Sequence, residues 1–476
     1  MIWERPLLKE LAARQPERLV ELVLSLQEQQ RQSRAQIEQL HEQLRAKNAQ
    51  LSQQAQKLEQ AQRAAHRQAA PFRRTQTERV AQPKKPGRKK GHPGSHRPRP
   101  AKIDQTIEVP LCGCPACGGT ALQDVQLVEQ FIEELPRVQP VVTQLKTYVA
   151  TCLHCQKQVR STHPLQMSIA TGAAGTQLGP NALATLAELK SKGLTLRKVC
   201  ALAQSLFALK ITAGGLAHAL RRLGKKCAPA YVELKTQLRT APVVHADETS
   251  WWLKNAQAWL WVFTHPTTTL YVIAEGRSRN VALEILGPDH PGTLVTDCLA
   301  IYDDVNARQQ KCYSHHLKAI KNARAEHPQP GAGYLADVQA MLHAAMVLKK
   351  AQPEMAAADF APRRQGLDLL AKALLTAPRS QPAEERVRNR LFKQSDHLFT
   401  FLDHAEVDAT NNLAERQLRP AVIFRKLSCG NKTQAGAQTW QILNSLAATC
   451  AQRGQSFLDF IRKVAPWQSP SLNLSG

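Results

Sequence analysis

The chain has 476 residues, with 63 Lys and Arg against 38 Asp and Glu and a formal net charge of +25. This length exceeds what one hydrophobic core usually holds, so we expect a multidomain α+β protein. The excess positive charge favours nucleic acid as the partner. Pro and Gly residues interrupt the longest uncharged stretch, residues 161–187, which excludes a membrane-spanning helix there, and no membrane partner is expected.

The first residues and the cysteines indicate the compartment. Glu4 lies where a secretory signal would carry basic and then apolar residues. Five of the 11 cysteines fall within residues 112–155, which is typical of a metal site in a reducing compartment rather than of disulfides. With a DNA partner, this predicts a cytoplasmic protein associated with the nucleoid.

Residues 1–70 are predicted to form a helix that pairs as a coiled coil. From residue 17 to residue 70 there is no Gly, Pro or aromatic residue, as expected of a long solvated helix. Apolar residues recur every seven positions, at Ile37, Leu44, Leu51 and Leu58. In that register Asn48 takes a buried position whose amide favours a dimer, so we expect a homodimer or a higher homo-oligomer. The alternative is one amphipathic helix packed on its own chain.

Residues 71–104 are predicted to form a basic linker that binds DNA. Residues 71–100 contain six Pro, three Gly and ten Lys or Arg against one Glu, a local charge of +9 that cannot build a core. Such a segment can lie along phosphates or place an arginine in a minor groove. The residues expected to do so are Lys84, Lys85, Arg88, Lys89 and Lys90. The alternative is a solvated spacer.

Residues 105–165 are predicted to form a zinc-binding domain. Two C-x2-C knuckles lie 34 residues apart, with strand-like alternation at residues 138–148 between them. Four thiolates complete the closed tetrahedral coordination of one structural Zn2+. The predicted ligands are Cys114, Cys117, Cys152 and Cys155, with Cys112 and His154 as spare donors. A redox C-x2-C motif is the weaker interpretation, because the surrounding βαβ pattern is missing.

Residues 166–240 are predicted to form a helical DNA-binding segment. Helical patterns at residues 194–206 and 212–223 are joined by residues 208–211, and Thr212 can cap the second helix. Basic residues near the end of that helix allow a helix-turn-helix interpretation. A helical hairpin of a protein core would have the same pattern, and the two interpretations stay open.

Residues 241–310 have the pattern of a mixed sheet that presents acids. Strand-like runs at residues 242–249, 259–264, 268–275 and 292–297 surround a helix-like run at 278–286, and the first and fourth strands end in Asp247 and Asp297. This order is what a sheet of the ribonuclease-H type needs to bring two distant carboxylates together. Residues 241–310 contain eight Asp or Glu against four Lys or Arg, and acids gathered in a basic protein indicate a cation, here Mg2+.

Four motifs in the second half of the chain carry a family resemblance. They are His245-Ala246-Asp247-Glu248-Thr249, Thr296-Asp297 before Tyr302, Cys312-Tyr313-Ser314-His315, and Asn411-Asn412-Leu413-Ala414-Glu415-Arg416 followed by Arg419-Pro420. Together they resemble the insertion-sequence-sixty-six family of DDE transposases over nearly the whole chain. The resemblance implies a ribonuclease-H-like mixed α/β catalytic domain at residues 241–476, with a helical insertion at about 325–408. It also implies that Asp247, Asp297 and Glu415 are the catalytic triad.

The resemblance implies a DNA transposase that cuts the 3′ ends of its mobile element and joins them to target DNA. Two Mg2+ ions held by the triad would support both steps. The partners would then be the terminal inverted repeats and target DNA, with companion proteins of the same element as a further class. A catalytically inactive, sequence-specific DNA-binding regulator and a nuclease without strand transfer are the alternatives.

Other residues near the triad have simpler interpretations. The basic residues after Glu415 are predicted to contact phosphates: Arg416, Arg419, Arg425 and Lys426. Glu415 also fits a capping box with Asn412 as the N-cap, which is compatible with a metal role. Cys312 and His315 are interpreted as a buried structural pair rather than a second metal site, and Trp251 and Trp252 as core residues.

Overall fold

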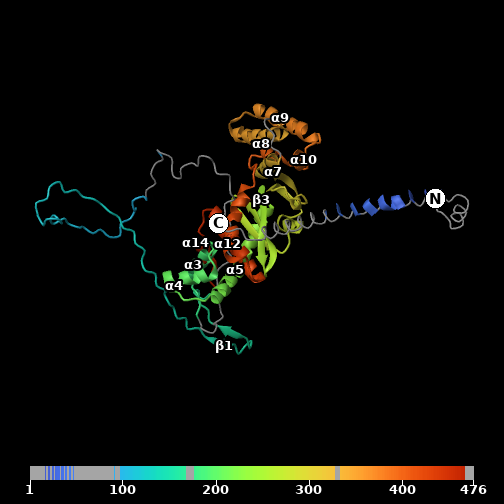
Figure 1. The fold of residues 1–476 in the computed structure, drawn as a ribbon. Coiled ribbons are helices and arrows are strands. Elements are labelled where there is room, and N and C mark those ends of the chain that lie inside the picture. The colour runs from blue at the N-terminus through green and yellow to red at the C-terminus, as the bar shows by residue number, and fades with distance from the viewer. Residues whose placement is uncertain are drawn as a thin grey trace. The chain divides into compact units, whose positions relative to one another are not determined.

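The computed structural model describes residues 97–167, 176–326 and 333–466, together with Gly91 and scattered positions between residues 17 and 47. The chain divides into two units, Met1–Pro86 and Gly87–Gly476 (Figure 1). In the first unit, the described positions are helical. The heptad residues, Asn48 and the five basic residues of the linker lie outside the described residues, so the coiled coil and the DNA-binding linker stay predictions.

The segment that contains the two cysteine knuckles has little regular structure. Strands β1 (Val149–Thr151) and β2 (Gln158–Arg160) form an antiparallel hairpin around the second knuckle. The strand predicted at residues 138–148 is wrong, since no strand forms there. Val141 and Val142 are exposed by 93% and 90%, so the alternation at this point has no apolar surface to pack against.

Three helices precede the sheet: α3 (Pro180–Ser191), α4 (Leu196–Phe207) and α5 (Ala213–Arg239). The two predicted helices are confirmed, and Thr212 caps α5 by accepting a hydrogen bond from the Gly215 amide. The second helix is much longer than predicted because α5 continues past Pro229. Apolar residues of all three helices share one hydrophobic core with the sheet, so α4 and α5 form a hairpin of that core, and their DNA-binding role stays a prediction.

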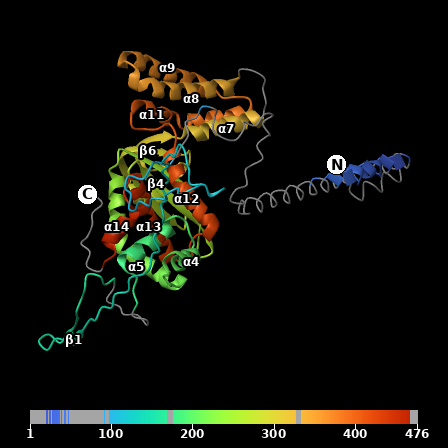
Figure 2. The same ribbon diagram turned by 90° about the vertical axis from the view of Figure 1, so that its left-hand side faces the viewer.

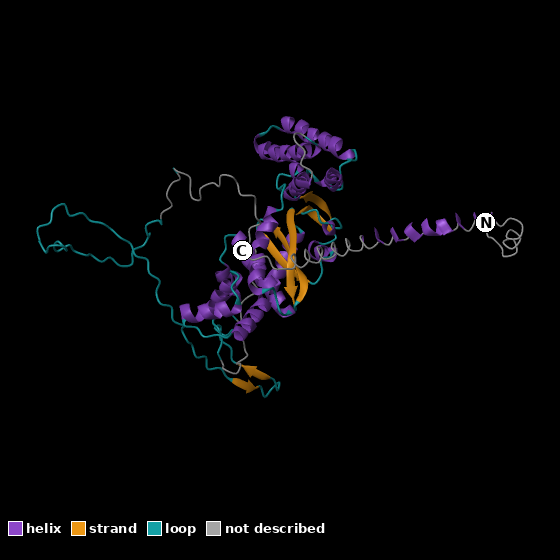
Figure 3. Ribbon diagram, in the orientation of Figure 1, coloured by secondary structure: helices purple, strands orange, loops and turns teal. Residues whose placement is uncertain are grey.

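A five-stranded mixed sheet forms the centre of the second unit (Figure 3). Its strands are β3 (Val243–Leu253), β4 (Ala256–His265), β5 (Thr268–Ala274), β6 (Asp289–Thr296) and β7 (Asn306–Lys311), with α6 (Arg279–Leu286) between β5 and β6. The strand order is β5-β4-β3-β6-β7. Strands β3, β4 and β5 are antiparallel, whereas β6 is parallel to β3 and β7 is parallel to β6. The predicted order of strands and helix is therefore confirmed.

Alternation along β4 explains why helices cover both faces of this sheet. Trp261 and Phe263 belong to the core that the sheet shares with α3, α5 and α6. Leu260 and Val262 belong to a second cluster, which contains Trp251. That cluster includes residues of α12 (Asn412–Ser428) and α13 (Gln434–Gln452), while α14 (Phe457–Val464) packs with α3. Because successive strand residues point to opposite faces, the apolar residues of β4 pack alternately against the helices on one face and on the other.

Helices fill the chain between the sheet and α12. They are α7 (Tyr313–Glu326), α8 (Tyr334–Ala351), α9 (Ala357–Thr376), α10 (Pro382–Phe392) and α11 (Thr400–Asp403), with short 3-10 turns at Gln352–Glu354 and Ser395–His397. A further 3-10 turn, Ala300–Tyr302, lies between β6 and β7. Helices α8, α9 and α10 lie together in both views (Figures 1 and 2). A separate apolar cluster that includes Leu342 and Phe401 holds them together, as expected of a helical insertion. Among the described residues, no helix is long and apolar enough to cross a membrane.

Candidate active site

Two aspartates are brought together by the pairing of β3 with β6. In this parallel pair His245 lies opposite Val295, so each aspartate comes two residues after a paired position. Gly292 allows the close approach, because a side chain there would clash with the Ala241 carbonyl. Strand β3 does not end at Asp247 as predicted but continues to Leu253. The acid is instead exposed to the site because β6 ends at Thr296.

Backbone amides hold both aspartates. The Glu248 N–H donates to Asp247 Oδ1 over 2.8 Å, and the Leu299 N–H donates to Asp297 Oδ1 over 3.0 Å. Each carboxylate is therefore held at one of its two oxygens. Both side chains are partly buried, which limits the water that could screen them.

Asn411 joins the third acid to the sheet. Its side-chain N–H donates to the Ala246 carbonyl over 2.8 Å, and its Oδ1 lies 3.3 Å from His245 Nδ1. Its backbone N–H donates to Cys312 Sγ over 3.2 Å. Asn411 is fully buried, so these contacts fix the start of α12 against β3, one residue before Asp247, and against the end of β7. Glu415 lies one turn further along α12.

The capping box predicted for Glu415 is wrong. Asn411, not Asn412, is the N-cap of α12, and its side chain makes no capping hydrogen bond because its amide is used in the contacts with β3. Glu415 is then the fourth residue of the helix, one position beyond the place that a capping box needs. The Glu415 N–H donates to the Asn411 carbonyl, as in ordinary helix, and the carboxylate remains available to the site.

Burial and neighbouring charges perturb the ionisation of Asp247. Burial raises the pKa of Asp247 to about 7, with further increases from the charges of Glu248, Asp297 and Glu415. The hydrogen bond from the Glu248 amide opposes this rise but does not cancel it. A carboxyl in this state favours either a proton or a cation.

Glu248, the neighbour of Asp247, has a different role. Its side chain is only 1% exposed and forms an ion pair with Arg277. It also accepts a hydrogen bond from the Tyr302 hydroxyl. Arg277 lies over the Trp259 ring, 4.6 Å from its centroid. The Glu248 charge is therefore compensated inside the protein, which leaves Asp247 as the acid of β3 that faces the site.

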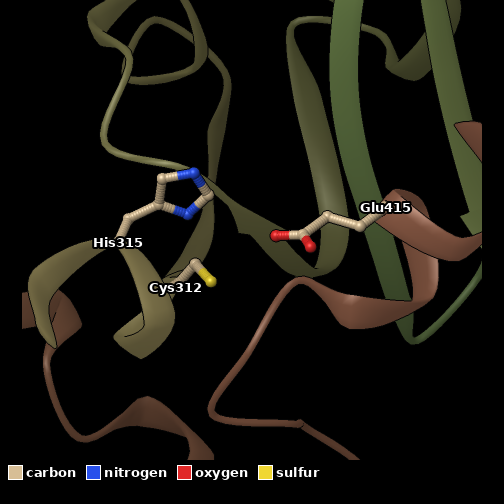
Figure 4. A group of neighbouring side chains, drawn as sticks. All are labelled: Cys312, His315 and Glu415. Atoms are coloured by element: carbon tan, nitrogen blue, oxygen red, sulfur yellow. The ribbon is translucent and has the colours of Figure 1, made fainter. Parts of the chain in front are cut away.

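Cys312 and His315 form a cluster with Glu415, which the sequence reasoning missed (Figure 4). One ligand atom from each residue lies within 4.8 Å of the other two. Although burial opposes it, contacts with His315 and the Asn411 amide lower the pKa of the Cys312 thiol. The nearby sulfur and the charges of Asp297 and Glu415 raise the pKa of His315. The Cys-x-x-His spacing was the signal for the pair, but only the fold brings Glu415 to it.

A model of the Transposase IS66 family matches residues 175–439, more than half of the chain. The chain belongs to the IS66 family of transposases. It is also similar to the uncharacterized protein y4qI of Sinorhizobium fredii (strain NBRC 101917 / NGR234), with 23% identity over 252 residues. That match covers 44% of each chain, so this chain spans less than half the length of the curated relative.

The family match includes the basic residues after Glu415, which the structure places in two classes. Arg416 and Arg419 are exposed on α12, as a phosphate contact requires. Arg425 is half-buried and is already engaged, because its guanidinium donates to Thr249 Oγ1 over 3.1 Å and to Ser250 Oγ over 2.7 Å. Lys426 is half-buried as well. The predicted phosphate contacts thus have their simplest support at Arg416 and Arg419.

The predicted zinc ligands lie outside the family match, and the structure orders each knuckle separately. Backbone amides of Ala116 and Cys117 lower the pKa of Cys114, and those of Cys155 and His154 lower the pKa of Cys152. Thiolates are the form that binds zinc. Within the described residues, however, only Cys312, His315 and Glu415 bring three possible metal-binding atoms within 4.8 Å of one another. Neither the four knuckle cysteines nor the set of Asp247, Asp297 and Glu415 does so, and both predicted metal sites stay predictions.

Proposed function

We propose that the protein is a DDE transposase in which Asp247, Asp297 and Glu415 hold two Mg2+ ions and cut and join DNA. The observation that carries the proposal is the match to the IS66 family over residues 175–439, a range that contains all three acids. The acids come from β3, the residue after β6, and α12. Burial, together with the charges of Glu248, Asp297 and Glu415, raises the pKa of Asp247, which supports a shared charged site. The strand order β5-β4-β3-β6-β7, with an antiparallel first half and a parallel second half, supports a ribonuclease-H-like domain.

The donor set fits Mg2+ by its chemistry. Hard cations take oxygen ligands, and each of the three residues supplies a carboxylate. Asp247 is the natural shared ligand, because Asp297 and Glu415 both act on it. When bound, the two ions would activate water or the 3′-hydroxyl as the nucleophile and stabilise the leaving oxygen. The backbone amides that hold Asp247 and Asp297 orient these ligands before any metal binds.

DNA binding would come from parts of the chain on both sides of the site. We assign the linker lysines and arginines, Arg416 and Arg419 to phosphates, which position the DNA without reading its sequence. A zinc ribbon of Cys114, Cys117, Cys152 and Cys155 and the hairpin of α4 and α5 would complete the DNA-binding surface. The substrates would be the terminal repeats of the mobile element and the target DNA, acted on by a dimer or higher oligomer in the cytoplasm.

The test uses labelled DNA from both sides of the gene that encodes the chain, incubated with the full-length protein and Mg2+. We expect 3′-end cleavage and joining by the wild type and loss of both, by orders of magnitude, in Asp247→Asn and Asp297→Asn. Asp304→Asn is the matched control, since it removes an acid that pairs with Arg279 on the surface. Normal DNA binding without any Mg2+-dependent cleavage by the wild type would contradict the proposal and favour the DNA-binding regulator.

A further inference from the structure

The cluster of Cys312, His315 and Glu415 offers three different metal donors at one point (Figure 4). Cys312 directly precedes α7, and the His315 backbone N–H donates to the Cys312 carbonyl over 3.2 Å, so both side chains belong to the first turn of that helix. Glu415 comes from α12 on the other side. A sulfur, an imidazole nitrogen and a carboxylate oxygen thus converge from two helices.

The separations suit a small tetrahedral site. Zinc bonds of about 2.0–2.3 Å place neighbouring ligand atoms about 3.5 Å apart in a tetrahedron. The three donor atoms already lie within 4.8 Å of one another. Side-chain rotations that move these atoms by roughly 1 Å would bring them to the tetrahedral separation. Three protein ligands also leave a fourth position for water, as in open zinc sites.

The Cys312 and His315 side chains hydrogen-bond to each other, and a metal ion would replace that hydrogen bond. His315 Nδ1 is buried and makes no hydrogen bond within the described part of the chain. The Cys312 sulfur is held by the Asn411 amide at 3.2 Å, and that hydrogen bond leaves a lone pair of the sulfur free. Cys312 is fully buried as a residue and His315 partly so, which keeps this corner of the site drier than the protein surface. A buried ring nitrogen without a partner is costly unless something binds it.

The chemistry of this cluster differs from that of the three acids. Thiolate and imidazole select zinc-like cations, whereas Mg2+ prefers carboxylates and water. Glu415 is the one residue that belongs to both groups. The Glu415 carboxylate can therefore serve as a ligand either in this cluster or beside Asp247 and Asp297, but not fully in both at once.

We propose that Cys312, His315 and Glu415 form a second metal site, which takes Zn2+ or a similar thiophilic cation and withdraws Glu415 from the catalytic acids. Binding would replace the S–H bond of Cys312 by a sulfur–metal bond and release the proton to solvent. Occupation of the site would inhibit Mg2+-dependent cleavage and joining. The binding half stands on the cluster alone, and the inhibition half rests on the proposed function.

Co2+ absorption tests the binding half without any activity measurement. Full-length protein is stripped of bound metal with a chelator, desalted and titrated with Co2+ while thiolate-to-cobalt absorption is recorded. We expect the wild type to bind one Co2+ per chain more than Cys312→Ser and to show the matching additional absorption. Cys298→Ser is the matched control, because its sulfur lies 3.7 Å from His316 Nε2 in a neighbouring Cys–His pair outside the cluster. Equal absorption in the wild type and Cys312→Ser would overturn the site.

Because Cys312 is buried, Cys312→Ser can fail to fold, and His315→Gln then carries the test. We expect this variant to lower the Co2+ affinity at least tenfold, with the unfolding curve of buried Trp251 and Trp261 as the check on folding. An unchanged affinity in a folded His315→Gln protein would also overturn the site.

The inhibition half is measured on labelled element ends with fixed Mg2+ and increasing Zn2+. Each variant is compared with its own zinc-free rate. We expect the half-inhibitory Zn2+ concentration of His315→Gln to rise at least tenfold above that of the wild type, with no such rise in Cys298→Ser. Equal zinc sensitivity of His315→Gln and wild type would contradict inhibition through this cluster. Absence of any Mg2+-dependent reaction would refute the proposed function instead, and the Co2+ result would still decide whether the site exists.

Discussion

Replacing Asp247 by Asn should stabilise the metal-free protein at neutral and alkaline pH. The pKa of Asp247 rises from 3.8 to about 7 in the folded protein, mainly through burial and then through the neighbouring acids. The folded state therefore binds this proton more tightly than the unfolded state does. Stability is fully retained below pH 4 and is lost as the pH rises from about 4 to about 7.

The size of the effect follows from the shift. A rise from 3.8 to about 7 corresponds to about 4 kcal/mol, at roughly 1.4 kcal/mol per pKa unit. Part of the Asp247 side chain is exposed to solvent, and screening by water reduces the free energy to about 2–4 kcal/mol. Asn keeps the oxygen that accepts from the Glu248 amide and removes the charge. The variant should gain this free energy of unfolding above pH 7 and nearly none at pH 4.

Urea unfolding, followed by fluorescence of the buried Trp251 and Trp261, measures the effect in buffers free of added Mg2+. Adding Mg2+ should stabilise the wild type, because a cation relieves the same repulsion, and should have less effect on Asp247→Asn. Asp304→Asn, at the surface pair with Arg279, should change stability little at either pH. A pH-independent difference between wild type and Asp247→Asn would refute the raised pKa of Asp247.

Three further predictions concern other parts of the chain. Asn411→Ala should lower the free energy of unfolding by about 2–6 kcal/mol, measured by urea unfolding, because the Ala246 carbonyl and His245 lose buried partners at about 1–3 kcal/mol each. Unchanged stability would mean that Asn411 does not hold α12. Cys117→Ser, or a chelator, should release one zinc per chain and unfold residues 112–155, because the free energy of zinc binding there stabilises the fold. Metal analysis and proteolysis measure the two effects, and a wild-type protein without zinc would refute the zinc ribbon. Neutralising Lys84, Lys85, Arg88, Lys89 and Lys90 should flatten the slope of log affinity against log salt by up to about 0.9 per lost phosphate contact, and an unchanged slope would leave the linker as a spacer.

The sheet could be predicted from the sequence because its pattern is local. Apolar runs such as residues 259–264 and 268–275 mark the strands, and Gly and Pro mark their ends. The extent of β3 was missed for the same reason. Polar Asp247, Glu248 and Thr249 interrupt the apolar pattern, but the pairing of this stretch with β4 carries the strand on to Leu253. The hydrogen bonds to β4 set the end of β3, which the side-chain pattern alone placed too early.

The site could be predicted only in part, because its contacts join distant residues. The residue type alone does not decide whether Asn411 or Asn412 is the N-cap of α12. The hydrogen bond from the Asn411 side chain to the Ala246 carbonyl, 165 positions away, fixes Asn411 in that position. The same constraint moves Glu415 out of the capping box and leaves its carboxylate to the site. Local sequence likewise suggested a simple Cys312–His315 pair, since nothing within the Cys-x-x-His motif shows that α12 begins beside it.

Strand transfer by Glu415→Gln tests the central claim most directly. With the capping box excluded, this change removes a negative charge and a good Mg2+ ligand but no helix cap. We expect near-normal unfolding and DNA binding, with end cleavage and joining in Mg2+ reduced by orders of magnitude. Joining within a few-fold of the wild type, measured on labelled element ends, would contradict the assignment of Glu415 as the third acid and direct the search to Asp408.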